Sequence, residues 1–538
     1  MSRIGRSVSS VIAVPLASLA LLLTDARQAT AESPTVVSDS VEPRAERADQ
    51  RMTARIDELL TAAWTGQHME PAPLASDAEF LRRVSLDLTG VVPTVAEVRA
   101  FLTDADPAKR ARVIDRLLDS HRHADHLATT WRNMMVPRGS TVDGFDGQAG
   151  LQTWLRTEFA KNARYDHLVA DLLVATGAAR QGPGLFFTAF DLKPEELAAN
   201  TARMFLGIQI ECAQCHDHPF DKWTQQDFWG YAAFFARLGR DGDMRPGQTM
   251  RLIDKRAGEV MLPATDVVVP PRYPRGEVTI DDGFGTRRMK LGVWMVSRDN
   301  PFLARAAVNR VWANLFGRGL VEPVDDLSVR NPASHPELFE ELAAYFTETG
   351  YDLRNLFHTL ANTRAYQLSS RTWDNAPGRP ELFARATVRS LTAEQLYDSV
   401  MRVALADDAG AARGQSDSGF DVRRQAFVAK MQSQAQSKLD YDAGVAQVLE
   451  LLNGSEMASV TANPTSGMLA ALEAPVFTDR ERIEVLFLAT LSRGPDENEL
   501  TRSLEHLAQG NSASGDTSSA LGDILWALAN SAEFGLNH

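Results

Sequence analysis

Apolar residues recur at helical spacing along most of this chain, beginning near residue 52. Ile56, Leu59 and Leu60 start one such series, and Phe80, Leu81 and the residues after them continue the pattern. This spacing places the apolar side chains on one helix face, which must pack against other elements. Further helices are predicted at about 122–135, 150–161, 165–176 and 194–211, and helical patterns resume at residue 300. The sequence therefore predicts a mainly α-helical protein.

Helix starts are marked at several places. Thr94 with Glu97, and Thr224 with Asp227, have the three-residue spacing of an N-cap and its reciprocal acceptor. These pairs predict helices that begin at about 95 and 225.

The helical pattern is interrupted between residues 240 and 298. This stretch holds Pro263, Pro270, Pro271 and Pro274, together with short β-branched runs. Such residues favour turns and short strands. A chain of 538 residues is also long for one hydrophobic core. We predict two helical domains, 52–239 and 299–538, joined by a small β-rich or irregular insert at 240–298.

Residues 1–31 have the pattern of a secretory signal peptide. Arg3 and Arg6 precede an apolar run at 8–23, and small residues at 29–31 suit a cleavage site. The run is short compared with the roughly 20 residues that span a bilayer, and an uncleaved anchor is the alternative. Residues 32–51 are polar and are predicted to be a disordered linker. We expect an exported protein of the periplasm, cell envelope or extracellular space, with no membrane span after signal removal.

The formal net charge of −14 disfavours a nucleic-acid partner, because binding to phosphates needs a basic surface. The chain contains no glycine-rich phosphate loop, no Gly-x-Ser-x-Gly elbow and no His-Glu-x-x-His motif. The sequence therefore indicates no common hydrolase or nucleotide-binding class.

The chemically distinctive site is a short motif. Cys212 and Cys215 are the only cysteines of the chain, and His216 follows directly. Stabilising disulfides of exported proteins usually join distant segments, which this pair does not. Two thiols and an adjacent histidine are the set needed to bind haem covalently and to ligate its iron from the proximal side. We predict that Cys212 and Cys215 attach haem c and that His216 is the proximal ligand.

Two other uses of this motif remain open. Cys212, Cys215, His216, His218 and Asp221 could hold a metal ion such as zinc, although these ligands are crowded in sequence. The cysteines could also form a local disulfide without any cofactor. Met244, Met250 and Met261 are candidates for the sixth iron ligand. The simpler interpretation of each is a core or loop residue.

Other polar residues have structural interpretations. His121, His123 and His126 fit a solvated helix end, and His335 fits a turn before a helix. Asp325 and Asp326 could cap a helix or bind a cation, with capping preferred. Buried ion pairs are the expected role of four arginines on helical stretches: Arg82, Arg83, Arg305 and Arg310.

Several longer motifs resemble a known family. Two blocks resemble the secreted planctomycete cytochrome-associated domain, domain of unknown function fifteen-forty-nine. They are Phe-Leu-Arg-Arg-Val-Ser-Leu-Asp-Leu-Thr-Gly-Val-Val-Pro-Thr at 80–94, and Cys-Ala-Gln-Cys-His-Asp-His-Pro-Phe-Asp at 212–221 together with Phe228 to Phe235. The segments at 300–326, 334–338, 366–370 and 530–538 resemble its usual companion, domain of unknown function fifteen-fifty-three.

The resemblance implies an exported, largely helical protein without a settled activity. Members of the family are often fused to, or encoded near, a cytochrome-c-like domain and a sulfatase-like secreted protein. A cytochrome or a sulfatase-like secreted protein is therefore the expected partner. We expect any haem to lie on Cys212 and Cys215 themselves, with a role in electron transfer or in assisting a redox step. The alternative is a non-redox structural or interaction protein of the envelope.

Overall fold

The N-terminal half of the protein is built almost entirely from helices. The computed structural model describes residues 42–136, 150–179, 181–241, 250–276, 285–298, 300–371, 379–405, 422–431, 454, 467–513 and 517–538. Up to the cysteine motif, the helices are α1 (Glu42–Gly66), α2 (Asp77–Thr89), α3 (Val95–Thr103), α4 (Lys109–Leu118), α5 (His121–Met135), α6 (Leu151–Ala160), α7 (Tyr165–Val174), α8 (Gly184–Ala189), α9 (Pro194–Thr201) and the π-helix η2 (Ala202–Leu206). The predicted cap of α3 is confirmed, because Thr94 and Glu97 form a complete capping box.

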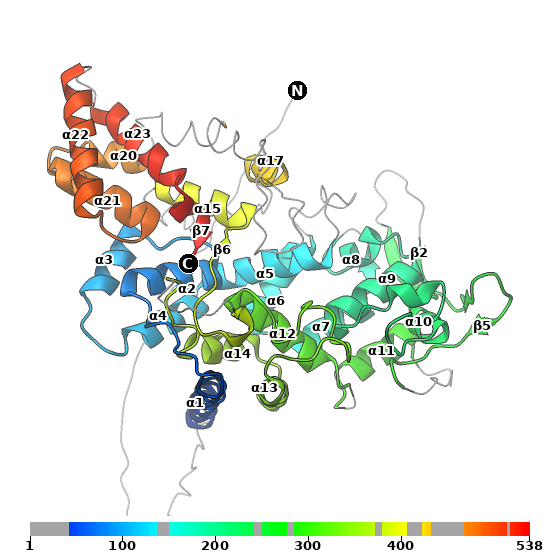
Figure 1. Cartoon of the computed structure of the whole chain (residues 1–538). Helices are drawn as coiled ribbons and strands as arrows, with labels where there is room; N and C mark the ends of the chain where they lie inside the picture. The colour runs from blue at the N-terminus through cyan, green and yellow to red at the C-terminus, as the bar shows by residue number, and fades with distance from the viewer. Residues whose placement is uncertain are drawn as a thin grey trace, which may run out of the picture. The chain divides into compact units, whose positions relative to one another are not determined.

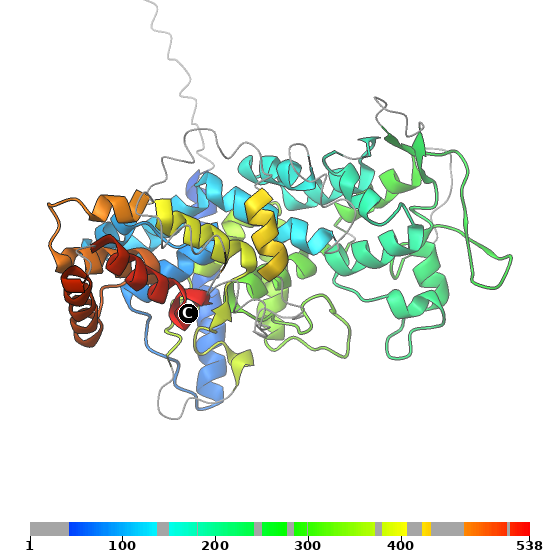
Figure 2. The ribbon, with the colours of Figure 1, turned by 90° about the horizontal axis from the view of Figure 1, so that it is seen from above.

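The second half continues the helical architecture. Its helices are the 3₁₀ turn η3 (Glu211–Gln214), α10 (Gln225–Ala232), α11 (Arg287–Met295), α12 (Leu303–Phe316), α13 (Pro336–Glu348), α14 (Leu353–Ala361), the 3₁₀ turn η4 (Pro380–Leu382), α15 (Ala393–Leu405), α17 (Val422–Met431), α20 (Gly467–Leu472), α21 (Asp479–Leu491), α22 (Glu497–Ala513), α23 (Thr517–Ala529) and α24 (Ala532–Gly535). In Figures 1 and 2 the helices α20 to α23 lie together, and α21 also contacts α3.

The strands are short and form three small antiparallel sheets. The first has the order β1 (Gly177–Ala178), β3 (Arg251–Asp254), β2 (Leu238–Asp241). The second pairs β4 (Val260–Met261) with β5 (Val268–Val269), and the third pairs β6 (Arg389–Ser390) with β7 (Leu536–Asn537). The prediction of a mainly α-helical chain is therefore confirmed, with small sheets inserted.

Two element boundaries differ from the sequence expectation. Helix α1 begins at Glu42, inside the stretch predicted to be disordered, because polar contacts hold this part of the helix: Asp49 accepts hydrogen bonds from Tyr345 Oη and Asn355 Nδ2, both at 3.0 Å. The insert at 240–298 also contains helix α11, whose start is capped by Thr286.

Hydrophobic packing crosses the predicted domain boundary. Residues Ala45–His538 form one compact unit. The larger core joins buried residues such as Phe80 and Trp131 to Trp312 and Phe346. A second core lies between α15, α20, α21 and α23, and it includes Leu86 and Val92 from the N-terminal half. The division at 239 and 299 remains a prediction from sequence.

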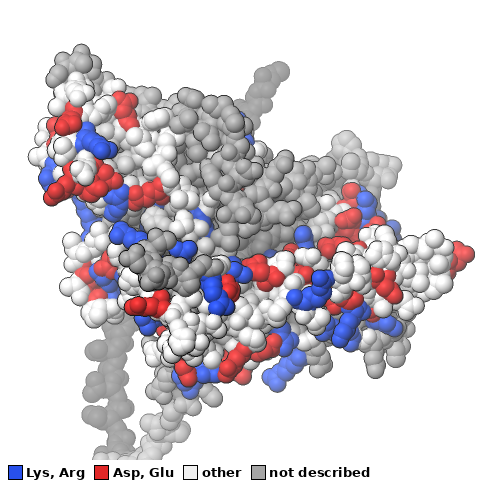
Figure 3. Space-filling model, viewed as in Figure 1, with Lys and Arg blue, Asp and Glu red and all other residues white. Residues whose placement is uncertain are grey.

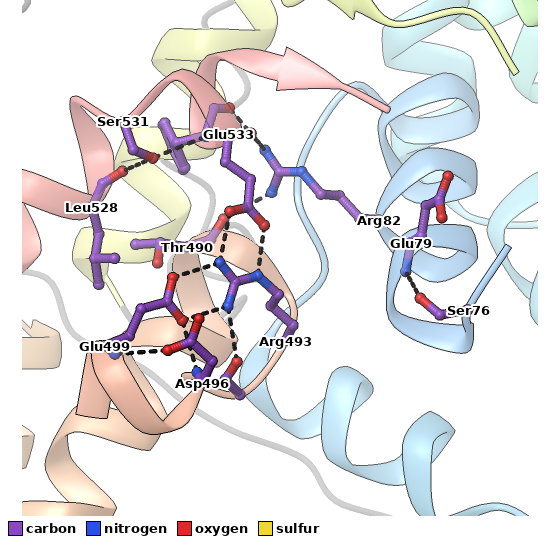
Figure 4. A network of polar contacts seen from close by, with 12 residues as sticks. Ser76, Glu79, Arg82, Thr490, Arg493, Asp496, Glu499, Leu528, Ser531 and Glu533 are labelled. Atoms are coloured by element: carbon purple, nitrogen blue, oxygen red, sulfur yellow. Dashed lines mark hydrogen bonds and ion pairs between the residues drawn. The ribbon is translucent and has the colours of Figure 1, made fainter. Parts of the chain in front are cut away.

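Helix α2 is buried on nearly every side. Its arginines donate hydrogen bonds to backbone oxygens near the end of the chain. Arg82 donates to the backbone oxygen of Thr490 at 2.8 Å (Figure 4). It also donates to the backbone oxygen of Phe534 at 2.8 Å. Arg83 bonds Glu79 at 2.7 Å and also the backbone oxygens of Tyr366 and Leu368. The predicted buried ion pair is therefore confirmed for Arg83. For Arg82 the predicted ion pair is wrong, because its guanidinium donates to backbone oxygens and not to a carboxylate.

Charges on the surface are mixed in sign. The face in Figure 3 shows Lys and Arg side chains interspersed with Asp and Glu, without a continuous basic stripe over the described residues. Within the described part of the chain, no helix is both long and apolar enough to cross a membrane. The predicted signal segment, 1–31, lies outside the described residues.

Candidate functional site

The cysteine motif follows a sharp break in the chain. The sequence predicted one helix running from 194 into the motif, and this prediction is wrong. Helix α9 passes into the π-helix η2, which ends at Gly207 in the left-handed conformation (φ 63°, ψ 35°). A Cβ on Gly207 would lie 2.9 Å from Leu327, and the Gly207 carbonyl accepts the Leu327 N–H at 2.7 Å. Both the φ angle and this close approach favour glycine.

The turn η3 (Glu211–Gln214) presents the two thiols to solvent. Ala213 is fully buried beneath the turn, whereas Cys212 and Cys215 on either side of it are exposed. Neither cysteine is in a disulfide. The thiols are thus accessible to a large reactant, while the backbone between them is anchored.

Helix α10 (Gln225–Ala232) fixes the end of the motif. Trp229 Nε1 donates to the Gln214 carbonyl at 3.0 Å, and Gln225 Nε2 donates to the Cys215 carbonyl at 2.9 Å. The helix starts at a complete capping box of Thr224 and Asp227, as the sequence predicted. Because the motif is held through its backbone, its thiols take no part in maintaining its shape.

His216 is exposed, and one of its two ring nitrogens forms a hydrogen bond. Its Nδ1 lies 2.8 Å from the Asp217 carbonyl. A carbonyl can only accept, so Nδ1 carries a proton, and in the neutral ring Nε2 keeps its lone pair. No described residue bonds Nε2. A histidine that ligates a metal through Nε2 usually donates its Nδ1 proton to a carbonyl or carboxylate.

His218 has the opposite arrangement. Its Nδ1 accepts the backbone N–H groups of Asp221 at 2.9 Å and of Phe220 at 3.2 Å. The proton of a neutral ring therefore lies on Nε2, which is then no metal ligand. Asp217 Oδ1 accepts from Gln225 N at 2.8 Å. His218 and Asp217 thus shape the turn after the motif.

No metal cage is formed by these side chains. Among the residues that the structure describes, no group of three or more His, Cys, Asp or Glu side chains is arranged to hold a metal ion. The methionines suggested as sixth ligand are dispersed: Met250 packs against the core, Met261 is exposed on β4, and Met244 lies outside the described residues.

The loop at residues 320–331, called the wall below, lies beside the segment that leads into the motif. Gln209 Nε2 donates to Asp325 Oδ1 at 3.1 Å, and Arg203 Nε lies 3.7 Å from Asp325 Oδ2. Asp326 accepts from Asn331 Nδ2 at 2.8 Å. Neither aspartate caps a helix, so that expectation is wrong. Asp325 joins the loop to the segment that leads into the motif, and Asp326 holds the loop together through Asn331.

Two polar residues of α12 (Leu303–Phe316) bond the neighbouring segments: Asn309 bonds the loop at 320–331, and Arg310 bonds the π-helix η2. Asn309 is fully buried; it donates to the carbonyls of Val321 and Val324 and accepts the Val321 N–H. Arg310 donates to the Met204 carbonyl at 3.2 Å in η2, and burial lowers its pKa. The buried ion pair predicted for Arg310 is therefore wrong, while Arg305 forms only an exposed pair with Glu340. Sequence patterns missed Asn309, whose one signal is an asparagine on an apolar helix face.

The wall also adds negative charge beside the motif. Partial removal from water raises the pKa of Glu211, and the neighbouring carboxylates of Asp325 and Asp326 raise it further. Glu211 directly precedes Cys212, so the approach to the motif is acidic.

The other histidines lie away from this site. His123 is buried, with Nδ1 bonded to the Leu88 carbonyl at 2.8 Å, and burial lowers its pKa to about 4. The expectation of a solvated helix end is therefore wrong for this residue. His335 precedes α13, as expected, and burial lowers its pKa as well.

Fold and site together define a mainly helical protein with an exposed Cys-x-x-Cys-His turn, whose preceding segment is bonded to the loop at 320–331. A family model described as PSCyt2, protein of unknown function (DUF1549), matches residues 55–240. A second, described as PSD1, protein of unknown function (DUF1553), matches residues 287–422. The chain belongs to the family in which these two segments follow one another in this order. No curated protein and no solved structure matches it.

Proposed function

We propose that this is an exported c-type haem protein of the cell envelope, with a role in electron transfer or in assisting a redox step. The observation that carries the proposal is the state of the Cys212, Cys215 and His216 side chains. Both thiols are exposed and unbonded, and His216 keeps Nε2 free while Nδ1 donates to a carbonyl. These are the groups and the tautomer that covalent haem binding needs.

The residues would act as follows. Cys212 and Cys215 would hold the porphyrin through thioether bonds to its two vinyl groups. His216 Nε2 would ligate the iron, while the Asp217 carbonyl keeps the imidazole ring in orientation. Bound haem supplies one-electron chemistry. Gln225 and Trp229 keep the motif backbone in place throughout.

Export is part of this proposal, because covalent haem attachment takes place outside the cytoplasm. We expect cleavage after Ala31, so that the secreted protein begins at Glu32. N-terminal sequencing of the mature protein tests this cleavage site. An intact N-terminus in the envelope fraction would instead indicate the membrane-anchored alternative.

The decisive measurement is the mass of the full chain after expression in a host with haem-attachment machinery. We expect the mature chain plus one haem, and a pyridine haemochrome spectrum of a thioether-linked haem. Cys212→Ser with Cys215→Ser abolishes both, whereas the remote exposed histidine variant His506→Ala on α22 retains both. A bare-chain mass without a Soret band refutes the proposal.

The second candidate is a non-redox structural or interaction protein, with the cysteines as a disulfide or metal staple. It is favoured by the hydrogen bonds of Asp217 and His218, which hold the turn without any added group. A mass lower by two hydrogens after aerobic purification, or retained zinc in elemental analysis, would support this candidate.

A further inference from the structure

The side chain of a phenylalanine close to the motif is exposed to solvent. Phe220 is 67% exposed, and no other phenylalanine that the structure describes is as exposed. Its backbone N–H donates to His218 Nδ1 at 3.2 Å, so this position belongs to the turn that follows the motif. The exposed ring, four residues after His216, therefore offers an apolar face beside the motif.

An arginine from the loop at 320–331 stacks on this ring. The Cζ atom of Arg330 lies 4.6 Å from the centre of the Phe220 ring. Arg330 is exposed and forms no ion pair with any residue in the described ranges. A guanidinium has five N–H donors, so the stacked position leaves donors available for a carboxylate.

We propose that Phe220 and Arg330 complete the haem site, with Phe220 covering part of the porphyrin and Arg330 pairing with a haem propionate. This inference rests on the proposed function. The motif itself supplies two thiols and one ligand, but a porphyrin also presents a broad apolar plane and two carboxylates. Glu211, Asp325 and Asp326 make the approach acidic and would repel a propionate. Arg330 supplies the opposite charge.

The proposal gives a physical reason why the two family segments occur in one chain. Phe220 lies in the first segment and Arg330 in the second. The loop that carries Arg330 is tied to the first segment by the bond between Leu327 N and the Gly207 carbonyl. The second segment therefore contributes a binding residue to the motif of the first.

The test compares the reduction potential of the holoprotein across pH for three proteins: wild type, Arg330→Gln and the control Arg480→Gln. Arg480 is an exposed arginine on α21 that is paired with Glu484. Loss of an arginine beside a carboxylate raises the carboxylate pKa by about one unit or more. We therefore expect the propionate inflection of Arg330→Gln to move to higher pH by about one unit, and its potential at neutral pH to fall. Both effects should shrink at high salt.

Phe220→Leu provides an independent readout. We expect haem attachment by mass to be unchanged, but the Soret circular dichroism to weaken, because the ring no longer packs against the porphyrin. Far-ultraviolet circular dichroism verifies that each variant is folded. Attached haem with wild-type potential curves in Arg330→Gln overturns this inference alone. A chain without haem overturns it together with the proposed function.

Discussion

The buried carboxylate of Asp87 allows a quantitative test of how the second half of the chain is fastened to α2. Arg389 Nη2 bonds both oxygens of Asp87, at 2.7 and 2.9 Å. Tyr366 Oη donates to the same carboxylate at 2.8 Å, and Asn537 Nδ2 donates at 2.7 Å. All four residues are buried, so water cannot replace a lost partner.

The change to test is Asp87→Ala. It leaves the Arg389 charge buried without its carboxylate, and removal of one partner from a buried pair costs about 3–5 kcal/mol. The hydroxyl of Tyr366 and the amide of Asn537 also lose their acceptor, but these losses are not additive within one network. We expect the free energy of unfolding to fall by about 4–5 kcal/mol. Asp87→Asn keeps the shape but loses the charge, and we expect a smaller fall.

Urea unfolding followed by tryptophan fluorescence measures this effect, with Glu484→Ala as control. Glu484 forms an exposed pair on α21, and exposed pairs contribute about 0–1 kcal/mol. In the double variant Asp87→Leu with Arg389→Met, neither charge is left alone, so it should be more stable than Asp87→Ala. The reasoning is refuted if Asp87→Ala costs no more than the control, or if the double variant regains nothing.

Three further results are expected. Burial lowers the pKa of His123 to about 4, so the unfolded chain takes up a proton first and stability should fall by up to about 3 kcal/mol as pH decreases from roughly 6.5 to 4; in His123→Leu this part of the decline should disappear from urea titrations. The carboxylates of Asp49, 3.5 Å from Nδ1, and Asp115, 3.1 Å from Nε2, raise the pKa of His358 despite partial burial, so the contribution of this residue is complete below about pH 6.5 and is lost as pH rises through the folded pKa. Wild type should therefore lose more stability than His358→Gln between pH 6 and 8, and parallel curves would contradict this. Asn309→Ala removes three hydrogen bonds, two of them buried and one partly buried, and we expect a loss of about 2–3 kcal/mol together with faster proteolysis at 320–331; an unchanged cleavage rate would show that Asn309 does not hold the loop.

Local sequence signals predicted the individual helices well. The apolar period and the caps at Thr94 and Thr224 depend only on residues a few positions apart, and both caps form as expected. The two cysteines and His216 were likewise evident from their spacing. Predictions from neighbouring residues fail where a contact with a residue far along the chain decides the local structure. Asp49 lies in a stretch that looked disordered, yet its bonds to Tyr345 and Asn355 place it in a helix.

The sequence by itself determined that the chain is mainly helical, and it singled out Cys212, Cys215 and His216 as the predicted site of its chemistry. Only the tertiary structure decided what surrounds them. The tautomer of His216 follows from its contact with the Asp217 carbonyl, and Arg330 reaches Phe220 from 110 positions away. Periodicity and motif spacing report on neighbours in the chain. The groups that would face a ligand are brought together by the burial of α12 and by the buried Asn309, which no local pattern encodes.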